Sequence, residues 1–118
     1  MKILIVDDSR AMRMLVKRAL RQAGVELDDI AEASDGREAL AKVAEFSPQL
    51  VLSDWNMPEM NGLEFLESLR GAGNRTPFIF VTSQVSEEMR QQARVSGAQR
   101  FVTKPFTADT FTQVFQDL

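Results

Sequence analysis

Short apolar runs alternate with amphipathic segments five times along this chain of 118 residues. The runs lie at 2–6, 30–33, 50–52, 78–81 and 101–102. Except for the weaker run at 30–33, which reads as an edge strand, they lack polar alternation, as is typical of strands buried on both faces. The pattern predicts a doubly wound α/β fold, in which five helices cover a five-stranded parallel sheet. No repeat or linker interrupts it, so we expect one domain, 1–118.

The first helical segment follows Asp8 or Ser9, either of which can cap it, and ends at Gly24. Its apolar residues recur at helical spacing and are expected to face the sheet: Met12, Leu15, Val16, Ala19, Leu20 and Ala23. Its basic residues are expected on the opposite side: Arg10, Arg13, Lys17, Arg18 and Arg21. We interpret that side as a solvated face, with docking of an acidic kinase or phosphotransfer surface as the alternative.

The later helices carry start signals of their own. Asp35 with Glu38 three residues on resembles a capping box, and Asn61-Gly62 opens the third helix. The segment 86–95 has a thin apolar face, so we expect this fourth helix to shift most easily. The last helix is expected to start at Thr107 and to bury these residues: Ala108, Phe111, Val114, Phe115 and Leu118.

Composition removes several classes of chemistry. The chain has no cysteine and no histidine, which excludes thiol catalysis, Cys-bound zinc and Ser-His-Asp catalysis. The net charge of -3 gives no reason to expect nucleic acid or an anionic membrane as a partner. There is no long apolar run and no signal peptide. We expect a cytoplasmic monomer.

Polar residues follow the predicted strands at the points where these end. Asp7 and Asp8 follow the first strand, and Asp54 follows the third. Thr82 follows the fourth strand and Lys104 the fifth. The carboxyl ends of parallel strands share one edge, where ligands of doubly wound folds bind. Each residue alone could serve only a turn or a cap, but together they predict a site.

The charges of this site indicate its ligand. Three carboxylates and one lysine sum to about -2, and like charges roughly 4 Å apart repel by about 4 kcal/mol at an effective dielectric near 20. A hard divalent cation, best Mg²⁺, would offset the repulsion. Asp54 is then a plausible nucleophile toward phosphorus, with Lys104 and the metal neutralising the phosphoryl oxygens. Thr82 could donate a hydrogen bond to one of these oxygens.

Four motifs carry a resemblance to a known family. They are VDDS at 6–9, SDWNMPEMNG at 53–62, VTS at 81–83 and TKPF at 103–106. In order and spacing they resemble the receiver domain of bacterial two-component response regulators, in particular single-domain chemotaxis receivers of the CheY type. The resemblance covers essentially the whole chain and implies the strand order 2-1-3-4-5.

The resemblance also implies roles for individual residues. Asp54 would take a phosphoryl group from a histidine kinase or a phosphotransfer protein, and would lose it by self-catalysed hydrolysis. Asp8 and Asp54 would bind Mg²⁺, with Asp7 acting mainly through water and Asn56 through its backbone carbonyl. The phosphoryl group would be contacted by three further residues: Lys104, Thr82 and Ser83. The peptide bond from Lys104 to Pro105 is expected to be cis.

A switch pair is implied as well. The Thr82 hydroxyl would move inward and the Phe101 ring would follow, changing the face formed by the fourth helix, fifth strand and last helix, where a downstream target would bind. Chemotaxis receivers typically carry tyrosine at the position of Phe101, so this chain can report by burial but offers no hydroxyl there. By itself, a strand phenylalanine would be read as core. Trp55 is expected to flank the pocket and to serve as a fluorescence reporter.

Three other readings compete. A small phosphatase with an aspartate nucleophile would need a substrate pocket, and the chain has no cap domain to supply one. A flavin- or nucleotide-binding protein would need a glycine-rich turn after the first strand, where this chain has Asp-Asp-Ser-Arg. The third is a receiver excised from a multidomain regulator. Because the chain starts with Met1 and ends on its last helix, we expect a stand-alone receiver with no output domain.

Overall fold

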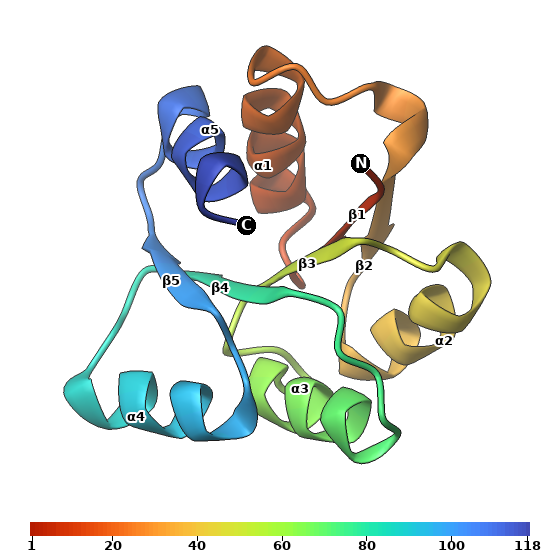
Figure 1. Ribbon diagram of the computed structural model, residues 1–118, viewed down its shortest axis with the longest axis vertical. Coiled ribbons are helices and arrows are strands. Elements are labelled where there is room, and N and C mark those ends of the chain that lie inside the picture. The colour runs from red at the N-terminus through yellow and green to blue at the C-terminus, as the bar shows by residue number, and fades with distance from the viewer.

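The apolar runs form one parallel sheet in the order β2-β1-β3-β4-β5, which confirms the predicted doubly wound fold (Figure 1). This computed structural model describes the whole chain, residues 1–118. The strands are β1 (Ile3–Val6), β2 (Ile30–Ala33), β3 (Leu50–Ser53), β4 (Phe78–Thr82) and β5 (Arg100–Thr103). The helices are α1 (Arg10–Gln22), α2 (Gly36–Phe46), α3 (Gly62–Gly71), α4 (Glu87–Ser96) and α5 (Ala108–Asp117), with a 3-10 turn at Leu27–Asp29.

Alternate residues of each strand face two separate halves of the core. Ile3 and Ile5 belong to the half that α1 and α5 cover. Leu4 and Val6 belong to the half under α2, α3 and α4, on the opposite side of the sheet in Figure 1. Because both faces are covered, every residue of β1, β3 and β4 is buried. This explains why these strands are apolar without alternation.

The capping box predicted at Asp35 and Glu38 is only half formed. The Asp35 side chain accepts a hydrogen bond from the Glu38 amide at 2.8 Å. The Glu38 carboxylate, however, accepts from the Ser34 hydroxyl at 2.7 Å instead of from the Asp35 amide. The Ser34 hydroxyl therefore takes the place of the Asp35 amide as the hydrogen-bond donor to the Glu38 carboxylate. At the start of α3, Asn61 and Glu64 form both bonds of a complete box.

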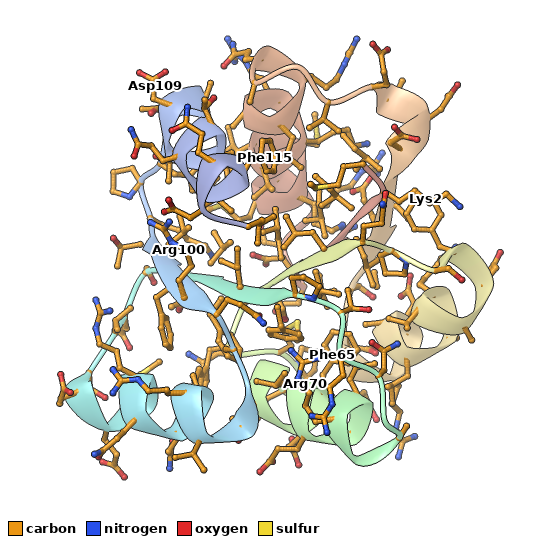
Figure 2. All side chains as sticks on the ribbon, viewed as in Figure 1. Lys2, Phe65, Arg70, Arg100, Asp109 and Phe115 are labelled. Carbon is orange, nitrogen blue, oxygen red and sulfur yellow. The ribbon has the colours of Figure 1, made fainter.

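Two leucines predicted to be buried are exposed, and a phenylalanine was missed. Leu15 is 51% exposed, since Val16 and Leu20 occupy the side of α1 that meets the sheet. Leu118 follows the last residue of α5 and is 48% exposed. Phe65 is fully buried and packs on Phe78 at 5.4 Å between ring centroids (Figure 2). α3 contacts both α2 and α4, so it buries more than one side of its surface.

The helices are short, with 10 to 13 residues each. None of them combines the length and the apolar character that crossing a membrane requires. α4 has the weakest hold on the core, because Ala93 is its one buried residue. Few buried contacts lower the cost of local movement, so α4 is the helix best suited to shift.

The turn between Asp54 and α3 allows no side chain at Gly62. A Cβ atom there would lie 2.1 Å from the Asp54 carbonyl oxygen and 2.9 Å from Cε1 of Phe80. The Gly62 amide also donates to the Trp55 carbonyl at 2.9 Å. This close approach of two backbone segments fixes the loop that leaves β3.

We predict that Gly62→Ala lowers the free energy of unfolding by about 2–3 kcal/mol, because the backbone must move to admit a methyl group. Gly71→Ala is the matched control. A Cβ atom at Gly71, the last residue of α3, meets nothing within 4 Å, so we expect no loss and up to about 1 kcal/mol of gain. Urea unfolding measures both variants, and equal losses would contradict the close-approach argument.

Candidate functional site

Three aspartates meet where β1 and β3 end. The Asp54 amide donates to the Val6 carbonyl at 2.8 Å, which sets the exit of β3 beside that of β1. One carboxylate oxygen from each of Asp7, Asp8 and Asp54 lies within 4.8 Å of the others. Asp7 is buried, Asp54 is half-buried and Asp8 is exposed. The predicted convergence of the three carboxylates is therefore observed.

Lys104 joins this cluster from the end of β5. Its Nζ atom lies 3.2 Å from Oδ2 of Asp7 and 3.7 Å from Oδ2 of Asp54. Its amide donates to the Thr82 carbonyl at 3.0 Å, so the backbone of Lys104 is held beside the end of β4. The peptide bond between Lys104 and Pro105 is cis. The site thus gathers three carboxylates and one ammonium group from three strand ends.

Backbone and guanidinium donors hold Asp7 in place. Its Oδ1 atom accepts from the Ser9 amide at 2.9 Å, and its carbonyl oxygen accepts from Nη1 of Arg13 at 2.6 Å. Arg13 in turn donates through Nε to Glu32 on β2 at 3.1 Å, and Lys17 pairs with the same carboxylate at 2.6 Å. The interpretation of the basic side of α1 as a solvated face holds for Arg10, Arg18 and Arg21, which are exposed, but was wrong for Arg13 and Lys17. Both are half-buried against the edge strand.

The folded structure shifts the pKa of Glu32 and the pKa of Asp54 in opposite directions. Burial alone would raise the pKa of Glu32, but the hydrogen bonds and charges of Lys17 and Arg13 hold it below its ordinary value. Burial also raises the pKa of Asp54, and there the charge of Asp7 adds to the effect. The charge of Lys104 and the Trp55 amide oppose that rise without cancelling it. The cluster therefore carries excess negative charge, which favours the binding of a further cation.

The other predicted site residues lie near strand ends but make no hydrogen bond to this cluster. Thr82 is a buried residue at the end of β4, but no buried polar atom of the chain lacks a partner, so its hydroxyl, which forms no hydrogen bond within the chain, reaches solvent. Ser83, the next residue, is exposed. Asn56 is exposed too, and its carbonyl accepts no backbone hydrogen bond. The structure brings together Asp7, Asp8, Asp54 and Lys104. The hydroxyls of Thr82 and Ser83 and the carbonyl of Asn56 remain free to form hydrogen bonds.

An aromatic stack starts at the residue after Asp54. The Trp55 amide donates to Oδ1 of Asp54 at 2.8 Å, and its ring is buried. That ring lies 4.8 Å from the Phe80 centroid and 6.1 Å from that of Phe101, with an interplanar angle of 20° to the latter. Phe80 and Phe101 lie 5.3 Å apart. Trp55 was expected at the flank of the pocket, but it is part of the core that connects Asp54 to Phe101.

The signals for the missed residues were weak. Arg13 belongs by spacing to the basic side of α1, and nothing local shows that Asp7 and Glu32 lie beside it. A partial signal for Trp55 was available, because a large aromatic directly after a buried strand often continues into the core. Its stacking on Phe101, 46 residues away in the printed sequence, depends on the pairing of β4 with β5.

We predict that Asp54→Asn stabilises the protein in metal-free buffer at pH 7 and raises its Tm. Folding raises the pKa of Asp54, so its ionised form disfavours the fold. That penalty is absent below the ordinary pKa of 3.8, grows as the pH rises toward the raised pKa, and is complete above it. Thermal unfolding from pH 4 to 8 should show the gain shrinking toward acid. Glu67→Gln, on an exposed part of α3, should show no gain.

Comparisons with known proteins agree with this geometry. The profile of the response regulator receiver domain family matches residues 3–116. Chemotaxis protein CheY1 of Helicobacter pylori (strain J99) is 40% identical over 111 residues, which cover 91% of this chain and 87% of the relative. Chemotaxis protein CheY-3 of Vibrio cholerae is 36% identical over 115 residues, which cover 96% of this chain and 87% of the relative.

Solved structures show the same architecture. Chemotaxis protein CheY4 of Vibrio cholerae superposes with a TM-score of 0.88 at 37% identity, covering 98% of this chain and 96% of the other. The receiver domain of the Francisella response regulator 1452 has a TM-score of 0.86 at 28% identity, covering 98% and 93%. The chain therefore belongs to the response regulator receiver domain family, with the fold of CheY-like receivers.

Proposed function

We propose that this receiver is a phosphorylation-controlled switch of a two-component system. Asp54 would accept a phosphoryl group from a histidine kinase, a phosphotransfer protein or a small phosphodonor. The observation that carries the proposal is the position of Asp54, at the end of a buried strand, beside two further carboxylates and 3.7 Å from Lys104 Nζ. Such a site offers a nucleophile, a counter-charge and room for a cation at one sheet edge.

The chemistry of the transfer follows from the two Asp54 oxygens. Oδ1 is held by the Trp55 amide, and Oδ2 lies on the side of Lys104. One carboxylate oxygen would form a bond to phosphorus while the bond from phosphorus to the donor atom breaks, and the donor keeps that electron pair. Lys104 would neutralise charge on the phosphoryl oxygens. In a separate hydrolysis step, a water oxygen would bond to phosphorus while the bond from phosphorus to the Asp54 oxygen breaks, which releases phosphate and restores the carboxylate.

The carboxylate cluster fits a magnesium ion. Its ligands are oxygens only, as a hard cation prefers. One oxygen from each of the three carboxylates lies within 4.8 Å of the others, so these residues could share one small cation, directly or through water. We assign Asp8 and Asp54 as direct ligands, Asp7 as a ligand through water because Lys104 and Ser9 already bind it, and the Asn56 carbonyl as a further ligand. Bound there, Mg²⁺ would supply positive charge to the transferring phosphoryl group.

The switch would use the free hydroxyls beside the site. The unpaired hydroxyl of Thr82 could donate to a phosphoryl oxygen, and Ser83 offers a second donor. Movement of Thr82 toward the phosphoryl group would make room for the Phe101 ring to turn inward. Phe80, opposite Phe101 in the pairing of β4 with β5, already contacts that ring. The change would reach the surface formed by α4, β5 and α5.

That surface would bind the downstream target. The two curated relatives are chemotaxis proteins by name, and we propose chemotaxis as the pathway of this chain. In keeping with the family, we further propose that it acts in the cytoplasm as a monomer, controls a protein partner and does not bind nucleic acid. Its role would be that of a signalling protein, with chemistry limited to its own phosphorylation and dephosphorylation.

We predict that beryllofluoride or acetyl phosphate, added with Mg²⁺, changes the fluorescence emission of Trp55. Trp55 is the single tryptophan of the chain, and its amide binds the carboxylate that would be modified. Asp54→Asn should abolish the part of the change that depends on the phosphoryl group or its analogue. If the Trp55 emission of the wild type does not change under these conditions, the proposed function is wrong.

Lys104→Gln should separate metal binding from phosphoryl binding. Lys104 competes with a metal ion for Asp7 and Asp54, so removing its charge is expected to tighten Mg²⁺ binding severalfold, on the order of 1 kcal/mol or less. The beryllofluoride response should weaken at the same time, because the phosphoryl analogue loses its ammonium partner. Titrations of Trp55 emission measure both affinities. Lys42→Gln on α2, where Lys42 pairs with Glu45, is the control and should change neither.

A further inference from the structure

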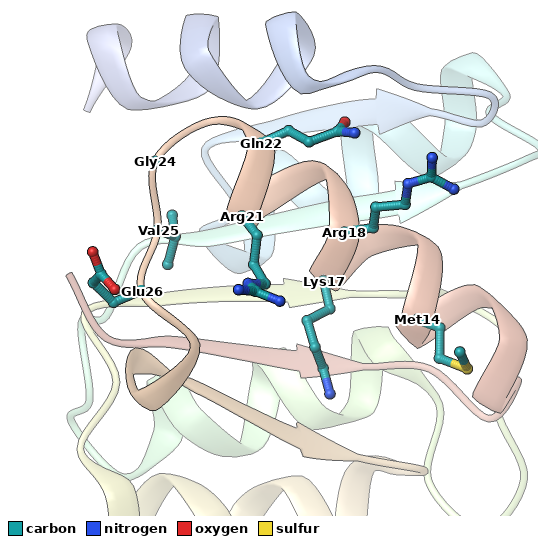
Figure 3. Close-up of a pocket in the computed structure, with 8 residues that line it drawn as sticks. All are labelled: Met14, Lys17, Arg18, Arg21, Gln22, Gly24, Val25 and Glu26. Carbon is teal, nitrogen blue, oxygen red and sulfur yellow. The ribbon is translucent and has the colours of Figure 1, made fainter.

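Glu32 is a charged residue in the edge strand β2, whose other residues are apolar. It follows Ile30 by two positions, so it lies on the face of the sheet that α1 covers. Its carboxylate accepts from Nε of Arg13 at 3.1 Å and pairs with Nζ of Lys17 at 2.6 Å. Figure 3 shows Lys17 extending from α1 toward the strands, whereas Arg18 extends away from them. One carboxylate of β2 thus binds two cations of α1.

The Arg13 guanidinium makes a second bond, and this one reaches the aspartate cluster. Its Nη1 atom donates to the Asp7 carbonyl oxygen at 2.6 Å. Because the guanidinium is planar and Glu32 already holds its Nε atom, Nη1 has little freedom to leave that carbonyl. The Asp7 amide donates to the Ala33 carbonyl of β2 at 3.1 Å. Both sides of the Asp7 backbone are therefore tied to β2, one directly and one through Arg13.

Asp8 depends on these bonds for its position. Its side chain is exposed, and no hydrogen bond or ion pair within the chain holds its carboxylate. The amide nitrogen of Asp8 belongs to the same planar peptide group as the Asp7 carbonyl, so the bond from Arg13 fixes the plane from which Asp8 extends. On the other side, the Ser9 amide donates to Oδ1 of Asp7 at 2.9 Å. The backbone on both sides of Asp8 is held, and this places its carboxylate in the cluster.

We propose that Arg13 is a positioning residue for the metal site, held in place by Glu32, and that it raises the affinity for Mg²⁺ although its own charge repels a cation. The inference rests on the proposed function for the identity of the ion. Removal of the Lys104 charge is expected to tighten Mg²⁺ binding. Removal of Arg13 should weaken it, because the loss of a fixed ligand outweighs the loss of one repelling charge.

Lys17 provides the comparison that separates positioning from a role in stability alone. It ties α1 to the same Glu32 carboxylate as Arg13 does, but it makes no bond to Asp7. If the only purpose of these cations were to fasten α1 to β2, the two would be equivalent. The bond to the Asp7 carbonyl is what distinguishes Arg13, so Lys17→Gln removes the same charge and leaves that bond in place.

The test titrates MgCl₂ into the full metal-free chain, labelled with ¹⁵N and ¹³C, and follows the amide signals of the site by NMR. We expect Arg13→Gln to bind Mg²⁺ about tenfold more weakly than the wild type. Lys17→Gln and Arg21→Gln each remove one positive charge from α1 and should stay within about twofold of the wild type. Unchanged or tighter binding by Arg13→Gln would overturn the proposal, as would an equal loss in Lys17→Gln.

Two further variants test the geometry itself. Arg13→Lys keeps the charge but not the planar fork, so its Mg²⁺ affinity should fall between those of the wild type and Arg13→Gln. Glu32→Gln releases Arg13 without touching Asp7, and should shift the ¹³C signal of the Asp7 carbonyl in the metal-free chain, as Arg13→Gln does. Lys17→Gln should leave that signal in place. An Asp7 carbonyl signal that Glu32→Gln does not move would refute the connection from β2 to the site.

A last measurement separates this inference from the proposed function. At saturating Mg²⁺, Arg13→Gln should bind beryllofluoride within about twofold of the wild type, because Asp54 and Lys104 are unchanged. A large loss there would indicate general damage to the site and would overturn the positioning role. A wild-type Trp55 response to beryllofluoride, with equal Mg²⁺ affinities of wild type and Arg13→Gln, would refute the role of Arg13 and leave the proposed function standing. Weakened Mg²⁺ binding by Arg13→Gln, with no Trp55 response in the wild type, would do the opposite.

Discussion

Electrostatic repulsion among three carboxylates at one sheet edge is the constraint on which the site depends. The aspartates cannot separate, because Asp54 is bonded to the backbone of β1 and Asp7 is held by the Ser9 amide and the Arg13 guanidinium. Lys104 offsets part of the repulsion from 3.2 and 3.7 Å. The edge of the parallel sheet thus carries excess negative charge, which would favour the binding of a cation there.

The proposed conformational response would end at α4, the helix with the fewest buried residues. Ala93 is the one buried residue of α4, yet this helix is not loose at both ends. Arg70 on α3 (Figure 2) donates at 2.8 Å to the carbonyl of Gly97, which caps the C-terminal end of α4. The N-terminal half, with Arg90 over the Phe101 ring, lacks such an anchor. In the proposed switch, a movement of Phe101 would therefore reach the part of α4 that costs least to move.

The order of apolar and amphipathic segments was enough to predict the fold, because the period of hydrophobicity is a local property of the chain. The same argument placed Asp7, Asp8, Asp54 and Lys104 at one edge, since a residue that directly follows a buried strand has little freedom in where it lies. Caps were less certain. The Glu38 carboxylate accepts a hydrogen bond from the Ser34 hydroxyl and not from the Asp35 amide, because two nearby donors compete for it.

Only the tertiary structure decided how the helices rotate and what meets across the sheet. The exposure of Leu15, the bond from Arg13 to the Asp7 carbonyl and the stack of Trp55 on Phe101 all depend on contacts between elements distant in sequence. Local patterns set which face of a helix is apolar, but the distance and angle between packed elements select the residues that touch. For this protein, the sequence by itself determined the sheet and the charges at its edge, and packing determined how these charges connect to the surface.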